Sequence, residues 1–221
     1  MKLGVVLACA GRGERLRKRN DKAFVRLGGK PLFLYSLELF SQIKSILQIA
    51  LVIRKESFSR ASRYVNGKNI ILVAGGRRRQ ESVYRGLMSL DRRITHVLIH
   101  DGARPLLQIK DIRKIQHSLK KYDAVTLGIP VKETLKRVAG SFVERTIQRE
   151  NLYSIQTPQG FRRSLLEEAY RRNKLNVSDE ARLIELLGRK VKIIHGDVRN
   201  IKITYPEDLL LGEIILRGLQ S

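Results

Sequence analysis

Residues 5–31, with the sequence VVLACAGRGERLRKRNDKAFVRLGGKP, constrain the fold more than any other stretch of the chain. They open with an apolar run at 5–8, which predicts a buried β-strand. The run passes directly into Gly11, Gly13 and a cluster of basic side chains. Glycine can take a positive φ and lets backbone N–H groups face a ligand without a Cβ in the way. We therefore expect an anion-binding loop at the end of the first strand, with a polyphosphate as its guest. The basic side chains of this loop are Arg12, Arg15, Arg17, Lys18, Arg19 and Lys22.

The spacing of this loop excludes two common phosphate-binding motifs. A Walker loop needs Lys-Ser or Lys-Thr after its last glycine, and here Glu14 follows Gly13. The dinucleotide fingerprint needs a small residue where this chain has Leu16. What remains is a Gly-x-Gly loop with Arg15 and Lys22 beyond it, which resembles the nucleotidyltransferases that build sugar or alcohol nucleotides. The alternative for this stretch alone is a tight turn on a basic surface.

Length and composition set the outer limits of the fold. A chain of 221 residues with 43% hydrophobic side chains can bury one sizeable core, so one domain is expected. No signal-peptide pattern or apolar run of membrane-spanning length is found, and a cytoplasmic location is expected. The single cysteine, Cys9, excludes an intrachain disulfide. Because no His is placed to activate it, we interpret Cys9 as a packed small residue and not a nucleophile.

The net charge of +23 favours polyanionic partners. A nucleotide, a phosphorylated metabolite and a nucleic acid all satisfy that condition. The basic residues are spread along the chain, and no zinc-finger, RNP or helix-turn-helix signature is present. Nucleic-acid binding therefore stays an alternative of a different class, and an ordinary solvated basic surface is a third interpretation.

Strand-like and helix-like segments alternate after the first loop. We expect helices at 32–43, 56–64 and 80–90, and strands at 46–53, 70–74 and 95–100. The segment at 46–53 is so apolar that it predicts a strand covered on both faces. This alternation predicts an α/β fold with a mostly parallel sheet, whose ligands collect at the carboxyl ends of the strands.

Two further loops fall at predicted strand ends. Gly76 belongs to a glycine pair whose backbone could read a base edge, and the Ser82 hydroxyl behind it can donate or accept. A plain turn with a helix-start serine is the alternative. In the second loop, HDGARP, Asp101 is placed to hold Mg²⁺ or a ribose hydroxyl, and Arg104 can grip a phosphate. A helix cap or turn former is the alternative role for such an Asp.

Seven pieces of sequence together carry a definite resemblance. They are ACAGRGERL with Lys22, the GG…S turn ending at Ser82, HDGARP, PVKETLKR, IQREN followed by QTPQGF, SDEA, and NIKIT with PEDL. In this order and spacing they resemble the cytidylyltransferases that act on 2-C-methyl-D-erythritol 4-phosphate in the non-mevalonate isoprenoid pathway. The match covers nearly the whole chain.

The resemblance implies a Rossmann-like three-layer nucleotidyltransferase fold, with a mostly parallel mixed sheet in one domain over residues 1–221. It also implies a protruding β-arm at about 132–149 that forms a homodimer. The sequence is consistent with the arm, because 131–147 is unusually polar and Ala139-Gly140-Ser141 makes a good turn. A solvent-exposed hairpin of this kind needs something to pack on, and a second subunit answers that need.

The reaction implied is attack by the 4-phosphate oxygen of methylerythritol phosphate on the α-phosphorus of CTP, with release of pyrophosphate and the help of Mg²⁺ or another divalent cation. The attacking phosphate is already a nucleophile, so the site needs no triad or dedicated base. By resemblance, the catalytic cations are Arg15, Lys22 and Lys202. The nucleotide-binding residues are Ala10, Gly11, Gly13, Gly76, Ser82 and Gly102. The substrate-binding residues are Asp101, Arg104, Thr134, Arg149, Thr157 and Ser178, and Asp101 is also the expected metal ligand.

The chain departs from the family's pattern at two positions. Asp21 stands where Pro is common, which predicts a more mobile loop that orders on CTP. Arg77 stands where an acidic residue often follows the glycines, which affects base recognition. Within the enzyme class, the alternative is ribitol 5-phosphate cytidylyltransferase, which shares the loops and differs in its acceptor; Thr134 and Arg149 favour methylerythritol phosphate.

Overall fold

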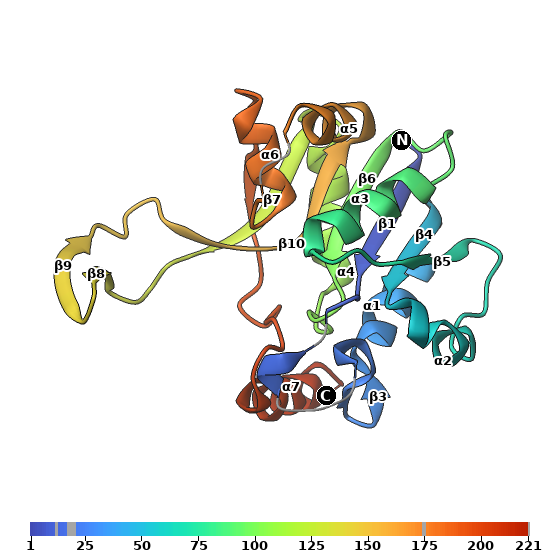
Figure 1. Ribbon diagram of the computed structural model, residues 1–221, viewed down its shortest axis with the longest axis horizontal. Coiled ribbons are helices and arrows are strands. Elements are labelled where there is room, and N and C mark those ends of the chain that lie inside the picture. Colours follow the sequence, from blue (N-terminus) through green and yellow to red (C-terminus); the bar gives the residue numbers. More distant parts are fainter. Residues whose placement is uncertain (12, 17–20, 174–175, 221) are drawn as a thin grey trace.

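The computed structural model describes residues 1–11, 13–16, 21–173 and 176–220. Four of the basic residues expected in the first loop, Arg12, Arg17, Lys18 and Arg19, lie outside these ranges. A seven-stranded sheet in the order β11-β7-β10-β6-β1-β4-β5 forms the centre of the molecule (Figure 1). Its strands are β1 (Leu3–Ala8), β4 (Ile46–Ile53), β5 (Ile70–Ala74), β6 (His96–Asp101), β7 (Ala124–Pro130), β10 (Tyr153–Arg162) and β11 (Lys192–His195).

Strand β10 is the antiparallel member of this mixed sheet. It pairs antiparallel with β6 and with β7, whereas β1 pairs parallel with β4 and β6, β4 with β5, and β7 with β11. The predicted α/β class and mostly parallel mixed sheet are therefore confirmed. Because β1, β4, β5 and β6 run in one direction, the loops that follow them meet at one edge of the sheet.

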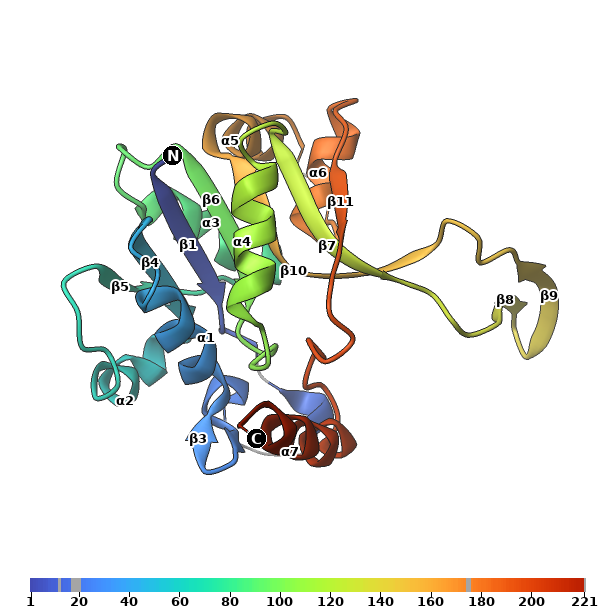
Figure 2. The same cartoon turned by 180° about the vertical axis from the view of Figure 1, so that it is seen from behind.

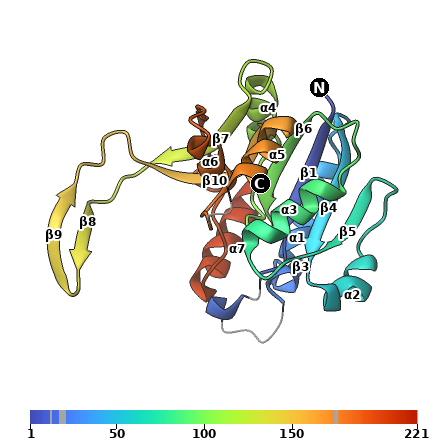
Figure 3. The same ribbon diagram turned by 45° about the horizontal axis from the view of Figure 1, so that its top comes forward.

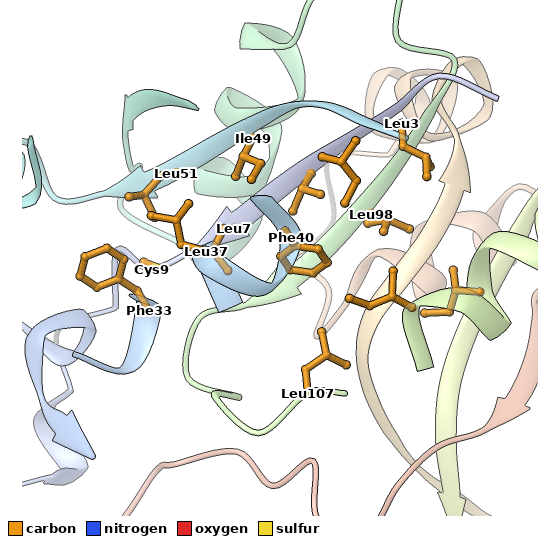
Figure 4. Packing of buried hydrophobic residues seen from close by; sticks show 14 of the residues in the cluster. Leu3, Leu7, Cys9, Phe33, Leu37, Phe40, Ile49, Leu51, Leu98 and Leu107 are labelled. Atoms are coloured by element: carbon orange, nitrogen blue, oxygen red, sulfur yellow. The ribbon is translucent and has the colours of Figure 1, made fainter. Parts of the chain in front are cut away.

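Helices cover both faces of the sheet, which gives three layers (Figures 1 and 2). Helices α1 (Leu32–Ser41), α2 (Phe58–Ser62) and α4 (Ile109–Ser118) pack on one face, and α3 (Arg79–Ser89), α5 (Arg163–Arg172) and α6 (Glu180–Leu186) on the other. Strand β4 serves both layers, since Leu51 lies in the first cluster and Val52 in the second. Figure 4 shows the first cluster, where Phe33 and Phe40 of α1 lie against Leu7 and Leu51.

A third, smaller apolar cluster lies outside the sheet. It joins helix α7 (Pro206–Gln220) to the short strands β2 (Arg26–Leu27) and β3 (Lys30–Pro31). Its buried members are Leu16, Val25, Leu27, Leu32, Leu106 and Ile203. Figure 1 places α7 beyond the carboxyl edge of the sheet. Three 3₁₀ turns of the described residues follow strands of the sheet: η1 (Glu14–Leu16) and η2 (Lys22–Phe24) come after β1, and η3 (Lys55–Ser57) comes after β4.

The predicted elements are recovered with small shifts. The strands at 46–53 and 70–74 are confirmed at their predicted bounds. The helix predicted at 32–43 ends at Ser41, and the segment at 56–64 divides into η3 and α2. Strand β6 continues to Asp101, one residue beyond its predicted end, because Asp101 still pairs with Ala8 of β1. Asp101 is therefore held by the sheet and is not a loop residue.

The hairpin of β8 (Leu135–Ala139) and β9 (Phe142–Ile147) projects away from the body of the molecule (Figures 1 and 3). Ala139 pairs with Phe142, so the turn consists of Gly140, at φ +57°, and Ser141. Phe142 is 81% exposed at the tip. The predicted turn and flanking strands are confirmed, and the hairpin leaves a large aromatic side chain in solvent. None of the helices in the described part of the chain has the length and apolar character needed to span a membrane.

Candidate active site

A pocket of about 990 Å³ lies at the carboxyl edge of the sheet. It is lined by Ala8, Cys9, Ala10, Gly11, Gly13, Arg15, Lys22, Ala23, Arg54, Lys55, Glu56, Gly75, Gly76, Arg77, Arg78, Arg79, Ser82, Arg85, Asp101, Gly102, Ala103, Lys202 and Thr204. Nine of these described residues are basic and two are acidic. The volume is at the upper end of the range for small-molecule sites, and the charge favours a polyanion.

The first loop closes over Lys22 because Gly13 has no side chain. Gly13 takes φ +72°, and a Cβ there would lie 2.9 Å from the Cβ of Lys22. Gly11 has no such requirement: its φ is not positive, and no described atom lies within 4 Å of the position its Cβ would take. The expectation of a glycine-dependent loop is therefore met at Gly13 and not at Gly11.

The glycine turn after β5 packs against the first loop and is tied to helix α3. A Cβ on Gly75 would lie 2.3 Å from the Cβ of Ala10, so glycine permits the two loops to touch. The Gly76 N–H donates to the Ser82 hydroxyl at 2.9 Å, and that hydroxyl donates to the carbonyl of Arg78 at 3.1 Å. Ser82 thus shapes the turn from within, which leaves the backbone edge of the glycine pair to face the pocket.

Arg77, the second departure from the family's pattern, has an acidic neighbour. The Arg77 N–H donates to Oε2 of Glu81 at 3.0 Å. The Glu81 Oε1 accepts a second bond from Nε of Arg78 at 2.8 Å. A carboxylate therefore reaches the glycine turn from helix α3 and offsets part of the local positive charge. Asp21, the other departure, is buried and accepts a hydrogen bond from Ser57 at 2.5 Å.

Two of the three predicted catalytic cations, Arg15 and Lys202, lie beside buried anchors. Leu16, next to Arg15, and Ile203, next to Lys202, are both buried in the third apolar cluster. The Ile203 N–H also donates to the carbonyl of Ala103 at 2.8 Å, which fixes its segment against the loop after β6. Packing of the apolar neighbours therefore holds the charged side chains at the pocket wall.

Asp101 lies at the centre of the charges. Its Oδ1 accepts from Nε of Arg79 at 3.0 Å, and its Oδ2 from Nζ of Lys202 at 2.7 Å. Burial of the carboxyl group opposes its ionisation, but Arg79 and Lys202 outweigh burial and hold the pKa of Asp101 well below its usual range. The carboxylate is therefore charged at every physiological pH.

Lys22 is the cation whose charge is most sensitive to its surroundings. Partial burial, together with the like charges of Lys202 and Arg15, lowers the pKa of Lys22 to about 8. An anionic guest would relieve that repulsion. Among the described residues, the lining of the pocket carries more positive charge than its own acids balance.

Two residues of the site were missed at the sequence level. Arg79 donates to Asp101 and also, through Nη1, to both carboxylate oxygens of Glu180 at 2.9 and 3.0 Å. Neither residue is among the predicted site residues, although Arg79 closely follows Arg77 and Glu180 lies in the segment SDEA. The sequence signal that could have found them is their position next to predicted strand and helix ends at the carboxyl edge of the sheet. Because 101 residues separate them, their contact could not be inferred from the sequence.

Five of the six expected substrate-binding residues do not line the pocket, and three of them are Arg104, Thr157 and Ser178. Arg104 donates to the backbone carbonyls of Asn200 and Ile155, at 2.7 and 3.2 Å. The Thr157 hydroxyl is buried and accepts the Asp101 N–H at 3.1 Å, so it supports the floor of the site from behind. Ser178 is exposed, just before helix α6.

Thr134 and Arg149 lie further away, at the base of the protruding hairpin. Both are exposed, and Arg149 donates to the carbonyl of Lys132. Neither residue reaches the pocket of its own chain. The structure thus brings together the expected nucleotide residues, the three cations and Asp101, whereas Thr134 and Arg149 lie away from them.

Cys9 packs against Gly102 between β1 and the loop after β6. The thiol is 6% exposed, and burial raises its pKa far above the usual value. This agrees with the interpretation of Cys9 as a packing residue, because the reactive thiolate is suppressed. A Cβ on Gly102 would lie 2.1 Å from the Cys9 sulfur, so the two residues are mutually dependent.

A Rossmann-like sheet with a basic pocket at its carboxyl edge places this protein in the nucleotidyltransferase class. Comparison with known sequences makes the assignment specific. The chain belongs to the family IspD, 2-C-methyl-D-erythritol 4-phosphate cytidylyltransferase, whose sequence model matches residues 3–218.

Curated relatives and solved structures agree with this family. The chain is 42% identical over 223 residues to the 2-C-methyl-D-erythritol 4-phosphate cytidylyltransferase of Geobacillus thermodenitrificans, with 98% of this chain and 97% of the relative covered. The enzyme of the same name from Halalkalibacterium halodurans is 40% identical, with the same coverage. The crystal structure of 4-diphosphocytidyl-2C-methyl-D-erythritol synthase from Anaerococcus prevotii superposes with a TM-score of 0.87 at 32% identity, over 97% of this chain and 96% of that one.

Proposed function

We propose that this protein transfers the cytidylyl group of CTP to 2-C-methyl-D-erythritol 4-phosphate, giving 4-diphosphocytidyl-2-C-methyl-D-erythritol and pyrophosphate. The observation that carries the proposal is the convergence of Arg15, Lys22 and Lys202 on one pocket beside Asp101, in a chain that matches this family over nearly its whole length. Neither the ribitol 5-phosphate alternative nor nucleic-acid binding has an observation in its favour.

The work of the site is positioning and charge neutralisation. An oxygen of the acceptor phosphate attacks the α-phosphorus in line, and the bond from that phosphorus to the oxygen of pyrophosphate breaks. Arg15 and Lys22 bind the triphosphate and stabilise the charge that develops at the phosphorus. Lys202 turns from Asp101 to the phosphates from the opposite wall.

The nucleoside end is assigned to the two glycine loops. Backbone groups at Ala10, Gly11, Gly13 and Gly76 recognise the cytosine. Ser82 fixes the conformation of the glycine turn after β5, and Gly102 lies beside the ribose. Asp101 accepts from a ribose hydroxyl or approaches the divalent cation. The proximity of Ala10 and Gly75 supports this assignment, because it brings both loops to one end of the pocket.

The protein side chains of the site fit Mg²⁺ only as an ion that is bound together with the phosphates of the nucleotide. The described residues contain no cluster of three or more His, Cys, Asp or Glu able to hold a metal. Asp101 supplies one ionised carboxylate, and Mg²⁺ commonly takes one or two carboxylates together with substrate phosphates and water. When bound, such an ion draws charge from the leaving pyrophosphate. We therefore assign Asp101 as its protein ligand.

The acceptor site is assigned to residues of two subunits. Thr134 and Arg149 are exposed on the hairpin and do not reach their own pocket, and Phe142 at its tip is unpacked. A homodimer in which each hairpin crosses to the other subunit would bury that tip and bring Thr134 and Arg149 to the partner's pocket. Arg104, Thr157 and Ser178 complete the acceptor side as further assigned residues.

The proposed reaction is tested by incubating the purified protein with CTP, Mg²⁺ and methylerythritol phosphate, and measuring pyrophosphate release. Ribitol 5-phosphate in a parallel incubation is the matched control for acceptor identity. We expect turnover with methylerythritol phosphate and little with ribitol 5-phosphate. Equal or faster release with ribitol 5-phosphate would reverse the assignment of the acceptor.

A further inference from the structure

Four charged side chains form an alternating row from the interior to the pocket. Glu180 binds Arg79, Arg79 binds Asp101, and Asp101 binds Lys202, with N–O distances of 2.9, 3.0 and 2.7 Å. We propose that Glu180 is a positioning residue for nucleotide binding and transfer: it holds Arg79, and Arg79 in turn fixes the Asp101 carboxylate in the orientation that the nucleotide meets. This proposal rests on the proposed function for the role of Asp101.

Glu180 is itself rigidly placed. It is the first residue of helix α6, and its side chain is 0% exposed. Asp179 caps the helix by accepting the N–H of Arg182 at 3.1 Å. Gln159 of β10 donates to Asp179 at 2.8 Å and accepts the N–H of Ala181 at 3.2 Å, which ties the first turn of the helix to the sheet.

The carboxylate of Glu180 has a second partner besides Arg79. The hydroxyl of Tyr170, on helix α5, donates to Oε1 at 3.1 Å. A buried carboxylate held by a guanidinium and a hydroxyl, on a helix start that is fixed to the sheet, has little freedom to move. Such a group can orient a neighbour without contacting the substrate.

Arg79 needs an anchor because of where it lies. Its side chain is 30% exposed on the wall of a pocket built for a polyanion. Phosphates entering that pocket attract the guanidinium away from Asp101. Glu180 opposes that attraction by binding Nη1 with both of its oxygens, and the planar fork leaves Nε aimed at Asp101.

Asp101 needs Arg79 most when the nucleotide is bound. In the structure Lys202 donates to Oδ2, and we assign Lys202 to the phosphates once the nucleotide is bound. Once Lys202 has turned, Arg79 remains as the side chain that fixes Oδ1. Oδ2 of Asp101 is then free to bind the ribose or the metal ion, and the Glu180–Arg79 pair fixes the position of that oxygen.

The test compares the variant Glu180→Gln with wild type in steady-state kinetics and in calorimetric titration with CTP and Mg²⁺. We expect kcat/KM for CTP to fall on the order of tenfold to a hundredfold, as for other groups that orient a ligand-binding residue. We expect CTP affinity to fall with it and KM for methylerythritol phosphate to change little. Glu167→Gln is the matched control, since Glu167 binds Arg163 at 2.7 Å and does not line the nucleotide pocket.

A second variant covers the case in which loss of a buried charge impairs folding. Arg79→Lys keeps the positive charge at a half-buried position but cannot serve two carboxylates in fixed geometry, so it should fold and show the same selective loss for CTP. If both variants keep wild-type CTP affinity and both KM values, and lose rate only in proportion to misfolded protein, the positioning role is refuted. If the wild type binds CTP without transferring it, the calorimetric comparison still decides the role of Glu180, and the proposed reaction alone fails.

Discussion

The contact between Gly102 and Cys9 gives a prediction whose size can be worked out from the structure. A Cβ at position 102 would lie 2.1 Å from the Cys9 sulfur, far inside any ordinary contact, and both residues are buried. Gly102→Ala therefore overpacks the junction of two loops that line the site, at a cost of about 1–3 kcal/mol. For a domain of this length, each kcal/mol lowers Tm by about 2–4 °C. We expect Tm to fall by several degrees and CTP turnover to fall with it.

The same geometry predicts a rescue. With the sulfur removed, the nearest atoms to the new Cβ are the carbonyl oxygen of Ala8 and the Cβ of residue 9, both at 3.6 Å, which is ordinary contact. Cys9→Ala alone should cost about 1 kcal/mol for the lost buried atom, and the double variant should be no less stable than Cys9→Ala. The two substitutions should thus couple by about 1–3 kcal/mol.

Thermal unfolding of the four proteins in this cycle measures the coupling, and pyrophosphate release shows whether the site recovers. Gly11→Ala is the control for a glycine in the same pocket with no described atom in the way, and its Tm should stay close to that of wild type. A Gly102→Ala variant as stable as wild type, or a double variant no better than Gly102→Ala, would refute the packing argument.

Three further predictions concern the cations and the hairpin. Because the pKa of Lys22 is about 8 in the free protein and phosphates favour the charged form, CTP affinity should fall as the pH rises above 8, whereas Lys22→Arg should remove most of that dependence; titration calorimetry from pH 7 to 9.5 checks it. Arg15→Ala should lower kcat on the order of a hundredfold while Tm changes by little, because its side chain is exposed, and comparable unfolding would show a structural role instead. If the hairpin completes the partner's site, mixing inactive Arg149→Ala and Lys22→Ala proteins should restore about a quarter of wild-type turnover after random exchange of subunits, because half of the dimers then have one intact site of two. No recovery under exchange would place both residues in the site of one chain.

Local sequence patterns predicted the parts of the fold that depend on neighbouring residues. The apolar run of β4 and the glycine break after β5 are signals contained within a few residues, and both elements lie where they were expected. The end of β6 was placed one residue early because pairing with β1 extends the strand to Asp101. Register between strands is a tertiary property that a single segment does not encode.

The candidate site divides in the same way. The Gly-x-Gly loop identified Lys22 and Gly13 because their chemistry and spacing are local. The pairing of Glu180 with Arg79 depends on how helix α6 docks beside β10, and the engagement of Thr157 with the Asp101 N–H depends on the antiparallel position of that strand. Neither contact could be inferred from spacing along the chain.

The third apolar cluster has a practical consequence for inhibitor design. Arg15 and Lys202 are both seated on side chains that pack with helix α7, and this cluster is separate from the two cores of the sheet. A compound wedged between α7 and Leu27 would displace the phosphate-binding cations while leaving the sheet intact. It would weaken CTP binding from a site that CTP does not occupy, and by reciprocity bound CTP would weaken the binding of the compound.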